Sequence, residues 1–164
     1  MPVKVKICGV RTPAIVEVAA GEGADYIGLV FFAKSPRSVT LAEAKALAKL
    51  ARGKVATMAV LVDPDDALIG AVMDDVNPDM LQLHGSETPE RVAAIGAKTS
   101  RPLMKAVRIA GEQDVASAAP YAECASYVLF DAKAPSGATI PGGNGVAFDW
   151  RALKNVRVPF ALSG

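Results

Sequence analysis

Residues 3–31, VKVKICGVRTPAIVEVAAGEGADYIGLVF, contain the pattern that decides the fold. The segment predicts a strand at 3–8, a helix at 12–23 and a second strand at 25–31. Thr12 occupies the N-cap position and Pro13 the first helical position, and both residue types are common at helix starts. Two strands joined through a helix form a right-handed parallel crossover. The stretch therefore predicts one strand–helix unit of an α/β protein.

The same unit recurs along the rest of the chain. Further strands are predicted at 54–62, 79–84, 102–108, 126–131 and 158–164. Helices are predicted at 40–53, 63–75, 88–97 and 112–121, with a short helix near 149–155. Thr40 and Glu43 match a capping box, and Asp63 and Thr88 are the expected N-caps of the next two helices. The strands are nearly continuous apolar runs, so we expect them to be buried on both faces.

This alternation fits either an open doubly wound sheet or a closed barrel. No GxGxxG motif follows the first strand, which weakens the dinucleotide-binding form of the open sheet. Seven evenly spaced strands favour a (β/α)8 TIM barrel, which typically has eight strands and about 250 residues. With 164 residues, the chain predicts a single incomplete TIM-barrel domain, residues 1–164, without the last helix–strand–helix portion.

Composition excludes several classes of function. The 18 basic and 17 acidic residues give a net charge of +1 without a basic stripe, so nucleic acid is not an expected partner. No signal peptide is recognisable, and no apolar run approaches the roughly 18 residues of a membrane span. Cys8 and Cys124 have no CxxC spacing, which argues against a metal cluster, a disulfide framework and thiol redox chemistry. We therefore expect a cytoplasmic protein without a bound metal.

Polar residues stand where the predicted strands end, which is where barrels of this kind carry their chemistry. These candidates are Cys8, Arg37, Asp63, Gln82, His84, Arg108, Asp131 and the glycine loop PGGNG at 141–145. A carboxylate such as Asp131, at the end of an apolar run, is costly unless it is paired or protonated. A thiol such as Cys8 at a strand end answers no packing requirement.

Each candidate also has a structural interpretation. Cys8 fits a small buried apolar residue, and Asp63 is explained by helix capping. His84 fits a hydrogen-bonded loop residue, and Arg37 fits a solvated loop charge. Lys105, inside an apolar strand, is assigned neither a functional nor a structural role. The residue types alone leave these alternatives open.

Six motifs, in order along the whole chain, resemble the phosphoribosylanthranilate isomerase family of tryptophan biosynthesis. They are KICG at 6–9, SPR at 35–37, QLHG at 82–85, KAVR at 105–108, LFDA at 129–132 and GGNGVAFDW at 142–150. The family more often has threonine at the position of Asn144. The resemblance implies an enzyme that uses no cofactor and acts on a small phosphosugar–anthranilate substrate.

The implied reaction is an Amadori rearrangement of N-(5-phosphoribosyl)anthranilate to 1-(2-carboxyphenylamino)-1-deoxyribulose 5-phosphate. An acid protonates the furanose ring oxygen to open the ring, and a base then removes the proton from C2. By resemblance Cys8 is the base and Asp131 the acid. The apolar residues beside Asp131 are expected to raise the pKa of its carboxyl, so that it keeps a proton near neutral pH.

The resemblance also assigns the substrate-binding residues. Arg37 would bind the anthranilate carboxylate through its forked guanidinium, and Gln82 and His84 would line the same pocket. The backbone N–H groups of Gly142, Gly143 and Gly145 would bind phosphate.

The family pattern continues past LSG at 162–164 with another helix, the eighth strand and a last helix. We therefore expect the 164-residue chain alone to be inactive. The alternative function is a non-catalytic barrel fragment that self-associates or pairs with a complementary segment, because its first and seventh strands would have open edges.

Overall fold

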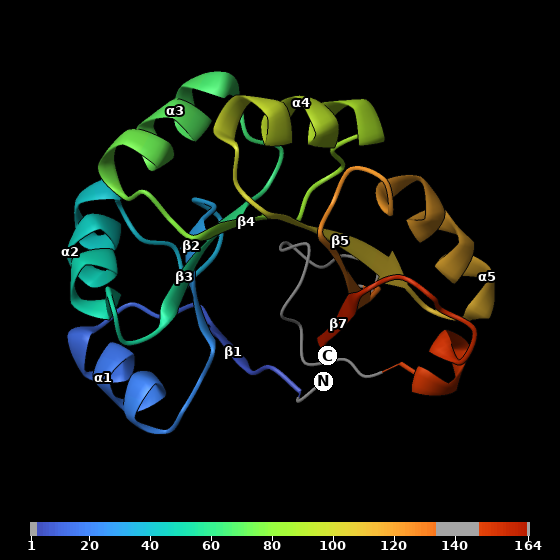
Figure 1. The fold of residues 1–164 in the computed structure, drawn as a ribbon, viewed down its shortest axis with the longest axis horizontal. Helices are drawn as coiled ribbons and strands as arrows, with labels where there is room; N and C mark the ends of the chain where they lie inside the picture. The colour runs from blue at the N-terminus through green and yellow to red at the C-terminus, as the bar shows by residue number, and fades with distance from the viewer. Residues whose placement is uncertain (1–2, 134–147, 164) are drawn as a thin grey trace. The chain divides into compact units, whose positions relative to one another are not determined.

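The computed structural model describes residues 3–133 and 148–163. Helices and strands alternate through these ranges (Figure 1). Two compact units divide the chain, Met1–Leu81 and Gln82–Gly164. The assignment of the whole chain to a single domain stays a prediction. Among the described residues, no helix is long and apolar enough to cross a membrane.

The first unit contains parallel strands followed by helices. Strand β1 (Lys6–Cys8) pairs with β2 (Tyr26–Phe31), and β2 pairs with β3 (Ala56–Leu61). Helices α1 (Pro13–Gly21), α2 (Leu41–Ala51) and α3 (Asp66–Asp75) follow these strands in turn, and β4 (Met80–Leu83) begins at the end of the unit. All of β2 after its first residue is buried, as the apolar run predicted. The same prediction is wrong for β1, whose three residues are intermediate or exposed.

Helix starts in the structure follow the capping chemistry of the sequence. The Thr12 side chain accepts a hydrogen bond from the backbone of Ile15 at the start of α1. Thr40 and Glu43 form both hydrogen bonds of the capping box at α2. Thr88 likewise caps α4 (Pro89–Thr99) in the second unit. These three predictions are confirmed, and each depends on residues within one turn of helix.

The prediction that Asp63 caps the third helix is wrong. Helix α3 begins at Asp66, and the Asp65 carboxylate accepts a hydrogen bond of 2.7 Å from the backbone N–H of Leu68. Asp63 has a φ of 45°, in the left-handed region, so it belongs to the turn after β3. The segment offers an acidic residue at both positions, and the backbone conformation decides which of them caps the helix.

The second unit contains another parallel set. Strand β5 (Leu103–Ile109) pairs with β6 (Tyr127–Ala132), and β6 pairs with β7 (Phe160–Ser163). The helix expected at 112–121 is divided into α5 (Glu112–Val115) and a 3₁₀ segment, η1 (Ala116–Tyr121). Pro120 cannot donate a backbone hydrogen bond, which disfavours a continuous α-helix there. The short helix expected near 149–155 is a 3₁₀ turn, η2 (Trp150–Leu153).

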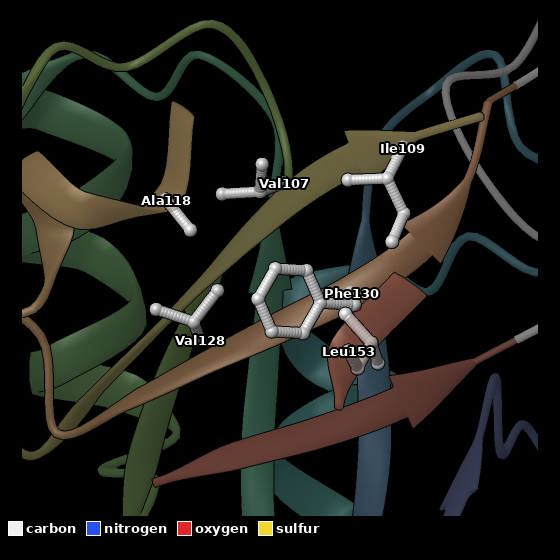
Figure 2. Close-up of a cluster of buried hydrophobic side chains, with 6 residues drawn as sticks. All are labelled: Val107, Ile109, Ala118, Val128, Phe130 and Leu153. Atoms are coloured by element: carbon white, nitrogen blue, oxygen red, sulfur yellow. The ribbon is translucent and has the colours of Figure 1, made fainter. Parts of the chain in front are cut away.

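An apolar cluster fixes which side chains of the second unit face the core (Figure 2). Its members come from β5, β6, η1 and η2: Val107, Ile109, Ala118, Val128, Phe130 and Leu153. Successive side chains of a strand point to opposite faces. Arg108 and Asp131, which pair in register across β5 and β6, therefore lie on the face away from this cluster. Core packing thus positions the polar candidates of this unit on the other face of its strands.

Candidate active site

In the first unit, Cys8 and Lys6 converge at a glycine. Cys8 is exposed at the end of β1 and pairs in register with Gly28 of β2. A Cβ atom added to Gly28 would lie 3.1 Å from the Cys8 sulfur and 3.0 Å from Lys6 Nζ. The missing side chain therefore leaves room for a thiol and an ammonium group to lie close together. Cys8 is therefore not the small buried apolar residue of the structural interpretation, because it is exposed.

A second glycine places Arg37 next to the same strand end. Gly9 has a φ of +80°, and a Cβ there would lie 2.6 Å from Arg37 Cδ. The aliphatic stem of Arg37 therefore packs directly on the Gly9 backbone, one residue after Cys8. The Arg11 guanidinium donates a hydrogen bond of 2.8 Å to the Pro36 carbonyl, which holds this loop. The structure thus brings two predicted site residues, Cys8 and Arg37, to one end of the first unit.

In the second unit, Asp131 is buried and strongly hydrogen-bonded. Its side chain accepts from Ser163 at Oδ1 and lies 3.0 Å from His84 Nε2 at Oδ2. Burial raises the pKa of the Asp131 carboxyl, but the hydrogen bonds from His84 and Ser163 outweigh it and hold the pKa below its ordinary value. The expected upward shift of this pKa is therefore wrong. The prediction rested on the apolar residues beside Asp131 in the sequence. In the folded chain, hydrogen bonds from His84 and Ser163, which are distant in sequence, stabilise the ionised carboxylate.

Gln82 and His84 extend the hydrogen-bond network of Asp131 within the second unit. Gln82 Nε2 lies 2.7 Å from His84 Nδ1, on the other side of the ring from Asp131. The backbone carbonyl of His84 accepts a hydrogen bond of 3.1 Å from the Arg108 guanidinium. Gln82, His84 and Asp131 thus form one continuous polar chain within the second unit. The predicted phosphate-binding glycines 142, 143 and 145 lie outside the described residues.

Lys105, left unassigned from the sequence, forms a buried ion pair. Its Nζ lies 2.8 Å from Glu87 Oε2, and both side chains are almost fully buried. The ammonium also donates to the Gly85 carbonyl at 2.8 Å, while Glu87 accepts from the Gly85 backbone N–H. The Tyr121 hydroxyl donates to the Glu87 carbonyl and its ring lies 5.5 Å from the ammonium. This ion pair fixes the loop that directly follows His84.

We expect Lys105→Met to lower the free energy of unfolding by about 3–5 kcal/mol, because the buried Glu87 carboxylate then loses its cation. Urea denaturation measures the change. The double variant Lys105→Met/Glu87→Gln should recover part of the loss, because no uncompensated buried charge remains.

The surface ion pair between Lys45 and Asp75 provides the control, since its side chains are 62% and 46% exposed. Lys45→Met should cost no more than about 1 kcal/mol. Equal losses for the Lys45 and Lys105 variants would contradict a stabilising role for the buried ion pair.

Sequence reasoning missed Glu87 and Ser163. Lys105 inside the apolar run PLMKAVR was a signal that a buried anion must exist, because a buried ammonium requires a partner. The sequence does not identify the acidic residue that pairs with Lys105, because Glu87 lies 18 positions earlier and only the tertiary structure brings the two together. For Ser163, 32 positions from Asp131, no comparable signal exists.

Parallel strands alternating with helices, with a thiol, a guanidinium, an imidazole and a carboxylate at strand ends, define an α/β enzyme of the barrel class. The model of the N-(5'-phosphoribosyl)anthranilate (PRA) isomerase family matches residues 5–164. A relative of that name from Rhodopseudomonas palustris is 50% identical over 100% of this chain and 76% of its own length. The chain belongs to the phosphoribosylanthranilate isomerase family, an isomerase family of tryptophan biosynthesis.

Solved structures agree with this assignment. The crystal structure of phosphoribosyl anthranilate isomerase from Thermotoga maritima matches with a TM-score of 0.87 and 31% identity, covering 99% of this chain and 77% of that chain. A second, complexed with reduced 1-(o-carboxyphenylamino)-1-deoxyribulose 5-phosphate, matches with a TM-score of 0.74 and 30% identity, covering 80% of this chain and 66% of that chain. The (β/α)8-barrel fold class is thereby confirmed, with seven of its strands among the described residues.

Proposed function

We propose that this protein converts N-(5-phosphoribosyl)anthranilate into 1-(2-carboxyphenylamino)-1-deoxyribulose 5-phosphate, with Cys8 as the base and the His84–Asp131 pair supplying the acid. The observation that supports the acid is the buried contact of 3.0 Å between His84 Nε2 and Asp131 Oδ2. A solved relative was crystallised with a reduced form of this same product, which supports the substrate class.

Ring opening comes first in the proposed reaction. A proton from Asp131 passes to the furanose ring oxygen as the C1–O bond breaks, which leaves a Schiff base between C1 and the anthranilate nitrogen. Because its hydrogen bonds favour the ionised form of Asp131, the carboxyl does not hold this proton alone. His84 shares the proton with Asp131 and returns it through the same hydrogen bond.

Proton abstraction follows. The Cys8 sulfur takes the proton from C2, and the C2–H electron pair forms the enolamine, which tautomerises to the ketone. Lys6 Nζ lies near the Cys8 sulfur, since a Cβ atom built on Gly28 would be 3.0 Å from the one and 3.1 Å from the other. No external oxidant or reductant is needed, since the oxidation of C2 to the ketone balances the reduction of C1 within the same molecule.

Arg37 is proposed to bind the anthranilate carboxylate, and Gly142, Gly143 and Gly145, which lie outside the described residues, to bind the phosphate. A cytoplasmic location is part of the proposal and is supported by the two free cysteines, Cys8 and Cys124.

Self-association also stays a prediction. Exposed apolar side chains on β1 and β7, such as Ile7 and Leu162, each 41% exposed, would be its contact surface.

Arg37→Lys tests the binding assignment by steady-state kinetics. Loss of the bidentate contact should raise KM about tenfold while kcat changes little, because a charged hydrogen bond contributes about 1.5 kcal/mol. Conversion can be followed through the absorbance or fluorescence of the anthranilate ring.

Two controls sharpen this test. Arg52→Lys, at an exposed position after α2, should leave KM unchanged. The aniline analogue of the substrate lacks the carboxylate, so wild type and Arg37→Lys should turn it over alike. A KM effect of the same size on this analogue would refute the carboxylate contact.

A further inference from the structure

The polar chain of the second unit ends in an amide that the reaction does not require. Gln82, His84 and Asp131 are 1%, 9% and 2% exposed, so their hydrogen bonds form away from bulk water. Gln82 Nε2 lies 2.7 Å from one ring nitrogen of His84, and Asp131 Oδ2 lies 3.0 Å from the other. An imidazole ring held at both nitrogens by buried groups has its protonation determined by those groups.

The amide nitrogen can only donate a hydrogen bond. Because it lies against Nδ1 of His84, that ring nitrogen must be the acceptor. The proton of the neutral ring is then on Nε2 and points at Asp131. Asp131 in turn accepts from both His84 and Ser163. In this orientation of the amide, Asp131 is held as a carboxylate and the pair contains one proton.

The amide oxygen of Gln82 points to a second protonation state of the His84–Asp131 pair. Gln82 Oε1 is buried and has no hydrogen-bond partner among the described residues, an arrangement that native structures rarely tolerate. If the amide reversed, Oε1 would face Nδ1 and require a proton there. Nε2 could then accept from a protonated Asp131, or donate to the carboxylate as part of an imidazolium ion. Either form contains one proton more than the observed state.

We propose that Gln82 is a positioning residue whose amide orientation determines where the proton of the His84–Asp131 pair lies. The orientation in the structure holds Asp131 ionised, and the reversed orientation accompanies the proton-loaded state that can act as an acid. This inference rests on the proposed role of Asp131. It adds to the expected place of Gln82 in the substrate pocket a role that Gln82 exerts through its contact with His84.

Variants of Gln82 leave the other charged groups around His84 in place. Asp131 faces the ring from β6, and the Arg108 guanidinium from β5 binds the His84 carbonyl. The Lys105–Glu87 ion pair holds the next residue, Gly85. A change seen on replacing Gln82 can therefore be assigned to the amide.

The test is ¹⁵N NMR of the His84 ring in the untagged 164-residue chain, whose sequence contains one histidine. Wild type should show a protonated Nε2 and an unprotonated Nδ1 at neutral pH. Gln82→Glu replaces the donor by a carboxylate of the same shape, which accepts from Nδ1. His84 should then be protonated at both nitrogens and bind its second proton at least about tenfold more tightly.

Gln82→Met removes the donor without adding charge, so His84 should become a mixture of two tautomers. Gln113→Met, at an exposed glutamine of α5, is the matched control and should leave the His84 spectrum unchanged. Wild-type His84 with its proton on Nδ1, or an unchanged single tautomer in Gln82→Met, would overturn the proposal. If Gln82→Met does not fold, the spectra of the wild type and of Gln82→Glu are sufficient to test the proposal.

The pH dependence of turnover provides a second, independent measurement. The limb of the kcat–pH profile that reports loss of the acid should move up by about one pH unit in Gln82→Glu, because the pair keeps its proton longer. A lower kcat with an unmoved limb would indicate a packing role only and contradict the proposal. If the NMR result holds but Asp131→Asn stays active, the placement of the proton stands and the acid assignment alone fails.

Discussion

Asp131→Asn is expected to lower kcat by about 10²–10⁴-fold, the usual contribution of a positioned acid. Asparagine keeps the size of the side chain, and its carbonyl oxygen can still accept from His84 Nε2. The amide cannot deliver a proton to the ring oxygen, so ring opening loses its acid. Stopped-flow or steady-state turnover measures the effect, with circular dichroism to verify that the fold is retained.

Asp149→Asn is the matched control for the acid. Asp149 is a half-exposed carboxylate that forms an ion pair with Arg151 on the surface, so its replacement should leave kcat within about twofold. An active Asp131→Asn enzyme would mean that another group protonates the sugar. Equal losses in both variants would point to a general effect of removed charge.

Cys8→Ser is expected to reduce kcat by about a hundredfold or more. Serine has nearly the same shape, and Cys8 is exposed at the end of β1, so the fold should not change. A hydroxyl group gives up its proton far less readily than a thiol, whose ordinary pKa is about 8.5. Serine therefore cannot act as the base at neutral pH, although the substrate still fits.

Cys124→Ser separates this effect from a general requirement for thiols. Cys124 is the other free cysteine and lies after η1, with its sulfur near the carbonyl groups of Pro120 and Tyr121. Its replacement should leave turnover unchanged. Retention of most activity in Cys8→Ser would remove Cys8 from the mechanism.

Much of the fold could be predicted because its signals are local. The caps at Thr12, Thr40 and Thr88 each involve contacts within three residues, so the sequence already contains both partners. The prediction for Asp63 failed because a local pattern cannot choose between Asp63 and Asp65 in DPDD. The backbone conformation makes that choice, and it places Asp65 at the N-cap of α3. The division of the 112–121 helix was missed because the pattern gave too little weight to Pro120.

By itself the sequence determined the order of the strands and helices, the burial of β2 to β6, and the family to which the chain belongs. The prediction that all strands are buried is wrong for β1 and β7, whose residues are intermediate or exposed. Only the tertiary structure decided the electrostatics of the site. The pKa of Asp131 is set by His84 and Ser163, which are 47 and 32 positions away, and Lys105 is neutralised by Glu87 across 18 positions. Local pattern cannot specify such partners, because the energy of a buried charge depends on which donors and acceptors the folded chain brings within hydrogen-bond distance.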